Sequence, residues 1–98
     1  MSDESVRSYR DLLVWQKGIA LVKSVYQLTK QFPAEERFGL TAQIRRAAVS
    51  APSNIAEGQA RHTTREFIRF VSNAERSMAE VDTQLVIDVE LNFCSSLS

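Results

Sequence analysis

The sequence predicts an all-α protein, an up-and-down antiparallel bundle in which three long helices pack side by side. Apolar side chains recur at three- and four-residue steps over most of the chain, and 3 Gly and 2 Pro in 98 residues leave little material for turns. With 44% hydrophobic and 24% charged residues, the composition suits one packed domain. We expect residues 1–8 to form a flexible tail and residues 9–98 to form a single helical-bundle domain.

The first helix is predicted over residues 10–31. Apolar residues form two stripes along it, so its apolar arc is wider than one neighbouring helix covers. We expect two neighbours to cover the arc, with part of it forming an oligomer interface. The interface candidates on this helix are Val14, Trp15, Leu21 and Val25. Pro33 ends the helix, because the residue before a proline avoids helical backbone angles.

The second helix is predicted over residues 40–60, antiparallel to the first because the link between them is short. Small residues in its buried stripe let a neighbouring backbone approach closely. The stripe consists of Leu40, Ile44, Ala47, Ala48, Ala51 and Ile55. Pro52 removes one backbone hydrogen bond inside the helix, which predicts a kink near this residue. Ser53 and Asn54 are placed to satisfy the freed backbone groups.

The third helix is predicted over residues 64–92. Thr63 and Glu66 have the spacing of a capping box at its start, and apolar residues then follow in steps of four and three. A second apolar stripe adds Phe70 and Val86 to the interface candidates. Residues 93–98 have the character of a linker, so we expect a fourth helix to be missing or truncated.

Composition also restricts the partners and the compartment. Twelve basic and twelve acidic side chains cancel, so the net charge itself predicts neither nucleic acid nor an acidic partner. A single cysteine, Cys94, excludes an internal disulfide and fits a reducing compartment. The polar N-terminus is not a signal peptide, and no apolar run is long enough to cross a membrane. We therefore expect a cytoplasmic protein without a membrane partner.

Residues typical of catalysis or metal binding are too few to form a site. His62 is the only histidine and Cys94 has no histidine at a motif spacing. The acidic residues of the third helix lack the Glu-x-x-His pattern of di-metal bundles, and no Gly-rich phosphate loop or zinc-protease motif is present. We predict no catalytic residue, no metal and no cofactor, and we do not expect an enzyme.

Arginine residues suggest a local basic surface. Nine of the twelve basic residues are Arg, the side chain that forks onto phosphate. A groove that gathers several of them could bind an RNA or DNA backbone with a strong dependence on salt. The candidates are Arg45, Arg46, Arg61, Arg65 and Arg69. The alternative is a solvated face on which these arginines pair with neighbouring acidic side chains.

A polar stripe runs along the second helix at helical spacing. It contains Arg46, Ser50, Ser53 and Glu57. These residues could line a seam between subunits or a pore, or they could only compensate for Pro52 and cap the bend.

Three motifs stand in order along the chain: LLVWQK at residues 12–17, GLTAQIRRAAVSAPSNIAEG at 39–58 and TREFIRFVSNA at 64–74. With these motifs the chain resembles, over about residues 9–92, the four helix bundle protein family, first noticed as 23S rRNA-intervening sequence proteins and also known as S23-type ribosomal proteins. The positions that match the signature of the family are Arg45, Arg46, Ser53, Asn54, Glu57 and Gly58.

The resemblance implies an antiparallel four-helix bundle that assembles into a ring-like homopentamer. A related member is the accessory protein of diversity-generating retroelements, a basic pentamer that binds nucleic acid and a reverse transcriptase, whereas this chain is neutral. From the residues and the resemblance together, we expect a non-enzymatic homo-oligomer, pentameric by resemblance, whose arginine surface binds RNA or DNA. The alternative is a protein-interaction scaffold that has no nucleic-acid role and docks a partner protein on its apolar arcs.

Overall fold

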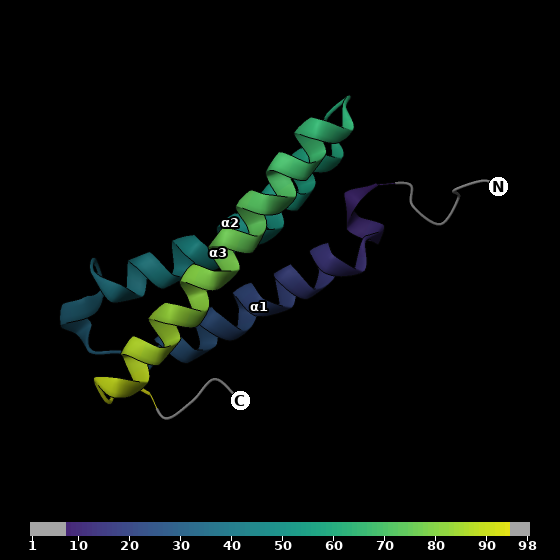
Figure 1. Cartoon of the computed structure of the whole chain (residues 1–98). Helices are drawn as coiled ribbons and strands as arrows, with labels where there is room; N and C mark the ends of the chain where they lie inside the picture. The colour runs from purple at the N-terminus through teal and green to yellow at the C-terminus, as the bar shows by residue number, and fades with distance from the viewer. Residues whose placement is uncertain (1–7, 95–98) are drawn as a thin grey trace.

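A computed structural model describes residues 8–94, and this part of the chain contains helices and no strand. The short helices are η1 (Tyr9–Asp11) and η2 (Ala34–Glu36). The long helices are α1 (Leu13–Thr29), α2 (Leu40–Gln59) and α3 (Thr64–Glu90). Figure 1 shows the three long helices side by side in alternating direction. The predicted class, an all-α up-and-down bundle with three helices, is confirmed.

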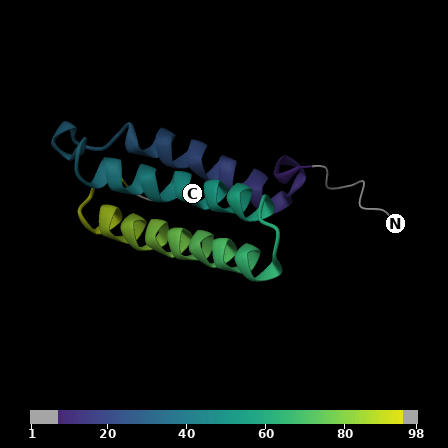
Figure 2. The same ribbon diagram turned by 90° about the horizontal axis from the view of Figure 1, so that it is seen from above.

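Helix α2 lies between the other two helices. It packs against α1 on one side and against α3 on the other, whereas the described backbones of α1 and α3 do not come into contact. Figure 2 shows this order clearly, with α2 as the middle layer. The packing of α1 and α3 on α2 therefore sets the positions of their side chains.

The first predicted helix is interrupted near its start. Ser8 caps η1, with its Oγ 3.1 Å from the donating amide of Arg10, and Leu12 then adopts an extended conformation before α1 begins at Leu13. The predicted continuous helix over residues 10–31 is therefore wrong at this end. At the other end α1 stops at Thr29, and residues 30–32 form turns before Pro33 instead of continuing the helix. Residues 1–7 of the predicted tail lie outside the described residues.

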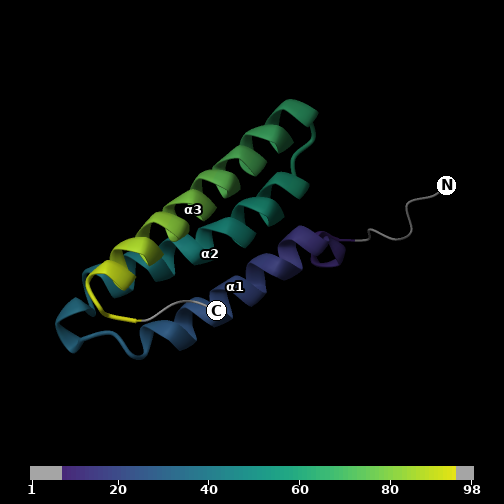
Figure 3. The ribbon, with the colours of Figure 1, turned by 60° about the horizontal axis from the view of Figure 1, so that its bottom comes forward.

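Helix α2 begins at Leu40 as predicted and continues through Pro52 to Gln59. Figures 1 and 3 show it changing direction near its middle, the part that contains Pro52. The predicted polar groups do bond to the preceding turn. Ser53 donates to the carbonyl of Val49 and the amide nitrogen of Asn54 donates to the carbonyl of Ser50, both at 2.8 Å. Neither side chain donates to the carbonyl of Ala48, which is free because Pro52 has no amide hydrogen to give it.

Gly18 allows α1 to approach the bend of α2. This glycine is buried, and a Cβ atom on it would lie 3.0 Å from the Cβ of Pro52 and 3.3 Å from its Cδ. Such distances are shorter than an ordinary carbon–carbon contact. The proline ring therefore occupies the space that a side chain at position 18 would need.

Helix α3 has a defined cap at each end. The Thr63 hydroxyl accepts from the amide of Glu66 at 3.1 Å, which is one half of the predicted capping box. At the other end Asn92 has a φ of 63°, and the amide of Phe93 donates to the carbonyl of Asp88, as in a Schellman motif. This motif ends the helix at Glu90, two residues before the predicted end. A fourth helix would begin after residue 94, and residues 95–98 lie outside the described part.

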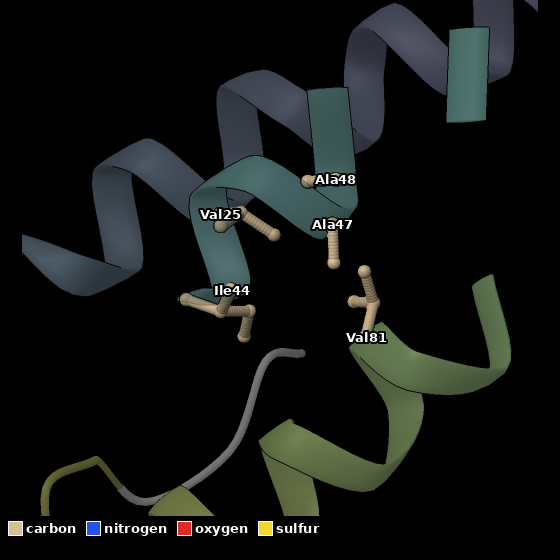
Figure 4. Packing of buried hydrophobic residues seen from close by; sticks show 5 residues of the cluster. All are labelled: Val25, Ile44, Ala47, Ala48 and Val81. Atoms are coloured by element: carbon tan, nitrogen blue, oxygen red, sulfur yellow. The ribbon is translucent and has the colours of Figure 1, made fainter. Parts of the chain in front are cut away.

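The core is built where all three helices meet. Figure 4 shows Val25 of α1 and Val81 of α3 directed toward the inner side of α2. The α2 members of this cluster are Ile44, Ala47 and Ala48. The small size of Ala47 and Ala48 lets the neighbouring helices come close, as predicted. Val25 is 0% exposed and Phe70 is 8% exposed, so both are corrected from interface candidates to core residues of a single chain.

An apolar groove opens over α2 between α1 and α3. It has a volume of about 320 Å³, and only Lys17 and Glu75 among its lining residues are charged. The apolar lining residues are Val14, Gly18, Ala51, Ile55, Val71, Ala74 and Met78. Of the other interface candidates, Val14 is 56% and Val86 is 62% exposed, whereas Trp15 and Leu21 are half-buried.

Candidate nucleic-acid interface

The five arginines proposed as phosphate contacts fall into two groups. Arg45 and Arg46 lie in the first half of α2, whereas Arg61 follows the end of α2 and Arg65 and Arg69 lie at the start of α3. The remaining turns of α2 separate the groups by about 20 Å at ~1.5 Å per residue. The five candidates therefore do not share one groove, although two of them, Arg45 and Arg46, line one pocket.

Arg45 and Arg46 line a pocket on the outer side of the α1–α2 pair. We call it the basic–aromatic pocket, and its volume is about 480 Å³. Its lining residues are Tyr26, Arg37, Phe38, Thr41, Ala42, Arg45, Arg46 and Val49. The residues that α2 gives to this pocket lie on a different face of the helix from Ala51 and Ile55, which line the apolar groove. The two depressions are therefore separate.

The Arg45 side chain is held in place by α1. Its Nε donates to the Thr29 hydroxyl at 2.8 Å, and its guanidinium carbon lies 4.4 Å from the centre of the Tyr26 ring. The Thr29 hydroxyl in turn donates to the carbonyl of Val25 at 2.8 Å. These contacts use one nitrogen and one face of the guanidinium, and they leave its terminal nitrogens available to an anion.

The arginines of this pocket have no ion-pair partner among the described residues. Within residues 8–94 the one ion pair joins Arg61 to Glu57 at 3.7 Å. No described carboxylate therefore lies within ion-pair distance of Arg37, Arg45 or Arg46. Unpaired guanidinium groups that share a concave surface attract anions, and a planar fork suits phosphate.

The pocket also contains residues that the sequence analysis did not identify as functional. Arg37 and Phe38 stand in the turn between η2 and α2, with the guanidinium carbon 5.5 Å from the ring centre. Tyr26 lies on an apolar stripe of α1, yet it is 41% exposed. The available signal was limited to Thr41 and Arg45, because a four-residue step places their side chains on one face of α2.

The second group of arginines has a different environment. Arg61 and Arg69 cover the ring of buried Phe70, with guanidinium carbons 4.5 and 5.0 Å from its centre. Glu57 partly neutralises Arg61. Arg65 is exposed on the first turn of α3. This group shields a core aromatic side chain, so it is less suited to phosphate than Arg45 and Arg46.

The predicted polar stripe of α2 divides between two environments. Ser50 faces α3, where its hydroxyl accepts from Ser77 at 2.9 Å and from the side-chain amide of Asn54 at 3.0 Å. Ser53 and Glu57 are exposed, and Ser53 bonds to its own helix. Of the four stripe residues, Arg46 and Ser50 line the polar groove of about 410 Å³ beside α3. Arg46 also lines the basic–aromatic pocket, so it connects the two depressions.

Asp88 is a buried acidic group near the C-terminal end of α3. It is 0% exposed, and neither carboxylate oxygen has a hydrogen-bond partner in the described part of the chain. Burial, and secondly the charge of Glu36, raise the pKa of Asp88. Across residues 8–94 no three potential metal ligands come together. Asp88 therefore belongs to no group of three described metal ligands, although its burial without a hydrogen-bond partner affects stability.

The two candidates for thiol and acid–base chemistry, Cys94 and His62, lie outside the long helices. Burial, and secondly the charge of Asp88, raise the pKa of the Cys94 thiol, which opposes the thiolate form that nucleophilic chemistry requires. His62 is exposed in the turn between α2 and α3. The described helices also include none that is both long enough and apolar enough for a membrane span.

Comparison with known proteins gives one match. The family model described as 23S rRNA-intervening sequence protein matches residues 10–98, which is most of the chain and includes every arginine discussed above. The description of this family names no reaction. A search of curated proteins found no match. With its three packed helices and a family match over nearly its whole length, the chain belongs to the 23S rRNA-intervening sequence protein family.

Proposed function

We propose that this protein is a non-enzymatic helical bundle that binds RNA through Arg45 and Arg46. The observation that carries this function is that these two arginines and Arg37 line one pocket, and that none of the three has an ion-pair partner among the described residues. Because the chain as a whole has a net charge of 0, the attraction for a polyanion must be local. RNA is the first polyanion to test, since the family description names an rRNA insertion.

Phosphate binding through arginine predicts a defined dependence on salt. Each phosphate neutralised on a single strand releases a counterion and contributes about −0.7 to the slope of log affinity against log salt. If Arg45 and Arg46 each contact one phosphate, their joint contribution to the slope is about −1.4. The structure also fixes Arg45 before binding, which lowers the entropy cost of ordering that side chain.

The test compares two double variants with the same change in charge. Arg45→Glu with Arg46→Glu should weaken binding of a labelled RNA strand more than about tenfold at low salt and flatten the salt slope by about 1.4. Arg65→Glu with Arg69→Glu is the matched control at the other end of the bundle and should change affinity much less. Fluorescence anisotropy measures both, and circular dichroism checks that each variant folds. Affinity that is absent at low salt, or indifferent to salt, would exclude this function.

The apolar groove supports self-association as the setting for this function. Val14 lines the groove and is 56% exposed, so a second copy could bury surface that one copy leaves in water. We expect a homo-oligomer, with five subunits as the number that the family resemblance implies. Light scattering should give a multiple of the chain mass, and Val14→Glu should reduce it. Ile68→Glu, at an equally exposed apolar position outside the groove, is the control. A wild-type monomer at micromolar concentration would exclude self-association.

The same groove favours a second candidate function, a protein-interaction scaffold without a nucleic-acid role. A partner protein would then occupy the groove between α1 and α3, and the arginines would only keep the surface soluble. The double variant of Arg45 and Arg46 separates the two functions. It should abolish RNA binding under the first and leave partner binding unchanged under the second.

A further inference from the structure

We infer that the basic–aromatic pocket takes a single-stranded segment of nucleic acid, with an unpaired base stacked on Phe38 and the neighbouring phosphates held by Arg45 and Arg46. This inference rests on the proposed function and names the form of its ligand. It depends on Phe38, Tyr26 and Arg37, the lining residues that phosphate binding alone does not explain.

Phe38 presents an open ring at the rim of the pocket. It is 88% exposed, the highest value among the large apolar side chains of the described part. Arg37 is the one described residue in a ring contact with it, at 5.5 Å. Tyr26 and Val49, which line the same pocket, are 41% and 40% exposed, so Phe38 belongs to an exposed apolar patch rimmed by arginines, and such a patch marks a binding surface.

The turn that carries Phe38 is held by several hydrogen bonds. The amides of Arg37 and Gly39 donate to the carbonyls of Ala34 and Glu36 at 3.1 and 3.0 Å. The Glu36 carboxylate accepts from the amide of Leu40 at 3.1 Å, which joins the turn to the start of α2. The ring is therefore presented from a hydrogen-bonded backbone, an arrangement that reduces the ordering cost of stacking.

Each of the two aromatic rings in the pocket lies beside an arginine, and this pairing of planar and charged groups suits a nucleotide strand. The Arg45 guanidinium already stacks on Tyr26 at 4.4 Å, and Arg37 lies beside Phe38. Small side chains, Thr41 and Ala42, also line the pocket. The volume of about 480 Å³ is sufficient for a nucleobase.

A duplex does not fit this arrangement equally well. In a double helix the flat faces of the bases stack on one another, so the ring of Phe38 could meet only sugar and phosphate. Unpaired bases expose these faces, and proteins bind them with aromatic rings and guanidinium planes beside a basic track. An acidic peptide would satisfy the arginines but would leave the ring without a planar partner.

The experiment measures anisotropy of a labelled oligouridine strand of about twelve nucleotides. The comparison ligands are the same strand annealed to its complement, an abasic strand of equal length, the DNA version and an acidic peptide. Phe38→Ala should weaken binding of the single strand about tenfold, while Phe38→Tyr keeps the ring and should stay within about twofold of the wild type. Ile68→Ala, at an exposed apolar position on α3, is the matched control and should change nothing.

Base stacking and phosphate attraction leave different signatures. Phe38→Ala should keep the salt slope of the wild type because the arginines remain, and the abasic strand should bind the wild type as weakly as the single strand binds Phe38→Ala. Equal affinity for duplex and single strand, no effect of Phe38→Ala, or full competition by the acidic peptide would overturn the inference. The proposed function would still stand in the first two cases, provided that the double variant of Arg45 and Arg46 loses binding. No RNA binding at low salt would overturn both. The DNA strand shows whether the 2′-hydroxyl contributes, since equal binding assigns the site to either nucleic acid.

Discussion

Gly18→Ala should destabilise the protein, although alanine is the better helix former. In an open helix interior this change stabilises by about 1 kcal/mol. Here the added Cβ would lie 3.0 Å from the Cβ of Pro52, 3.3 Å from its Cδ and 3.4 Å from its Cα. The proline ring is rigid and belongs to the backbone of α2, so relief requires α1 to move away. Overpacking of this kind costs about 1–3 kcal/mol. The two effects together predict a net loss of about 1 kcal/mol.

Thermal unfolding followed by circular dichroism at fixed protein concentration measures this loss. For a domain of this size about 1 kcal/mol corresponds to a Tm lower by roughly 4–8 °C. Ser24→Ala, at an exposed position of the same helix, is the control and should raise the Tm slightly. A Gly18→Ala variant that is more stable than the wild type would refute the close approach of α1 to Pro52.

Three further changes test other parts of the fold. Ionised Asp88 opposes folding because its folded pKa lies above the unfolded one, so its contribution to wild-type stability should rise as the pH falls through the raised pKa toward the ordinary value of 3.8. Asp88→Asn should show a smaller rise in urea midpoint, and an unchanged rise would contradict the burial of an ionisable group. Thr63→Ala should cost about 1 kcal/mol through loss of the cap on Glu66, with Thr63→Ser close to the wild type in chemical denaturation. Val81→Ala should cost about 2 kcal/mol by leaving a cavity at a position 1% exposed, and a loss under about 0.5 kcal/mol would argue against the packed core.

The helices themselves could be predicted because their signals are local. Proline and glycine delimit α2, and its bounds differ from the prediction by one residue at the C-terminal end. The break at Leu12 could not be predicted, because apolar periodicity continues across a single extended residue. The approach of Gly18 to Pro52 joins residues far apart in the sequence. It depends on how two helices are placed, which periodicity does not describe.

The candidate site could be predicted in part for a similar reason. The adjacent Arg45 and Arg46 are visible as a pair, and both line the basic–aromatic pocket. The separation of Arg61 from them depends on the length of α2 between the two groups. Phe38 could not be identified, because an aromatic residue in a short link is as compatible with the core as with the surface. Val25 was an interface candidate and is buried within one chain, because a wide apolar arc does not reveal which of its side chains a single chain buries.

The placement of α2 between two helices whose backbones do not come into contact has a consequence for unfolding. To swing α1 outward, the molecule must break its interface with α2 and the 5.7 Å ring contact between Phe32 and Phe93, while the hairpin of α2 and α3 can stay paired. Backbone amides of α1 should therefore exchange with deuterium through an opening that costs less free energy than complete unfolding. Such an opening would also uncover the inner side of α2 and widen the access to its apolar groove.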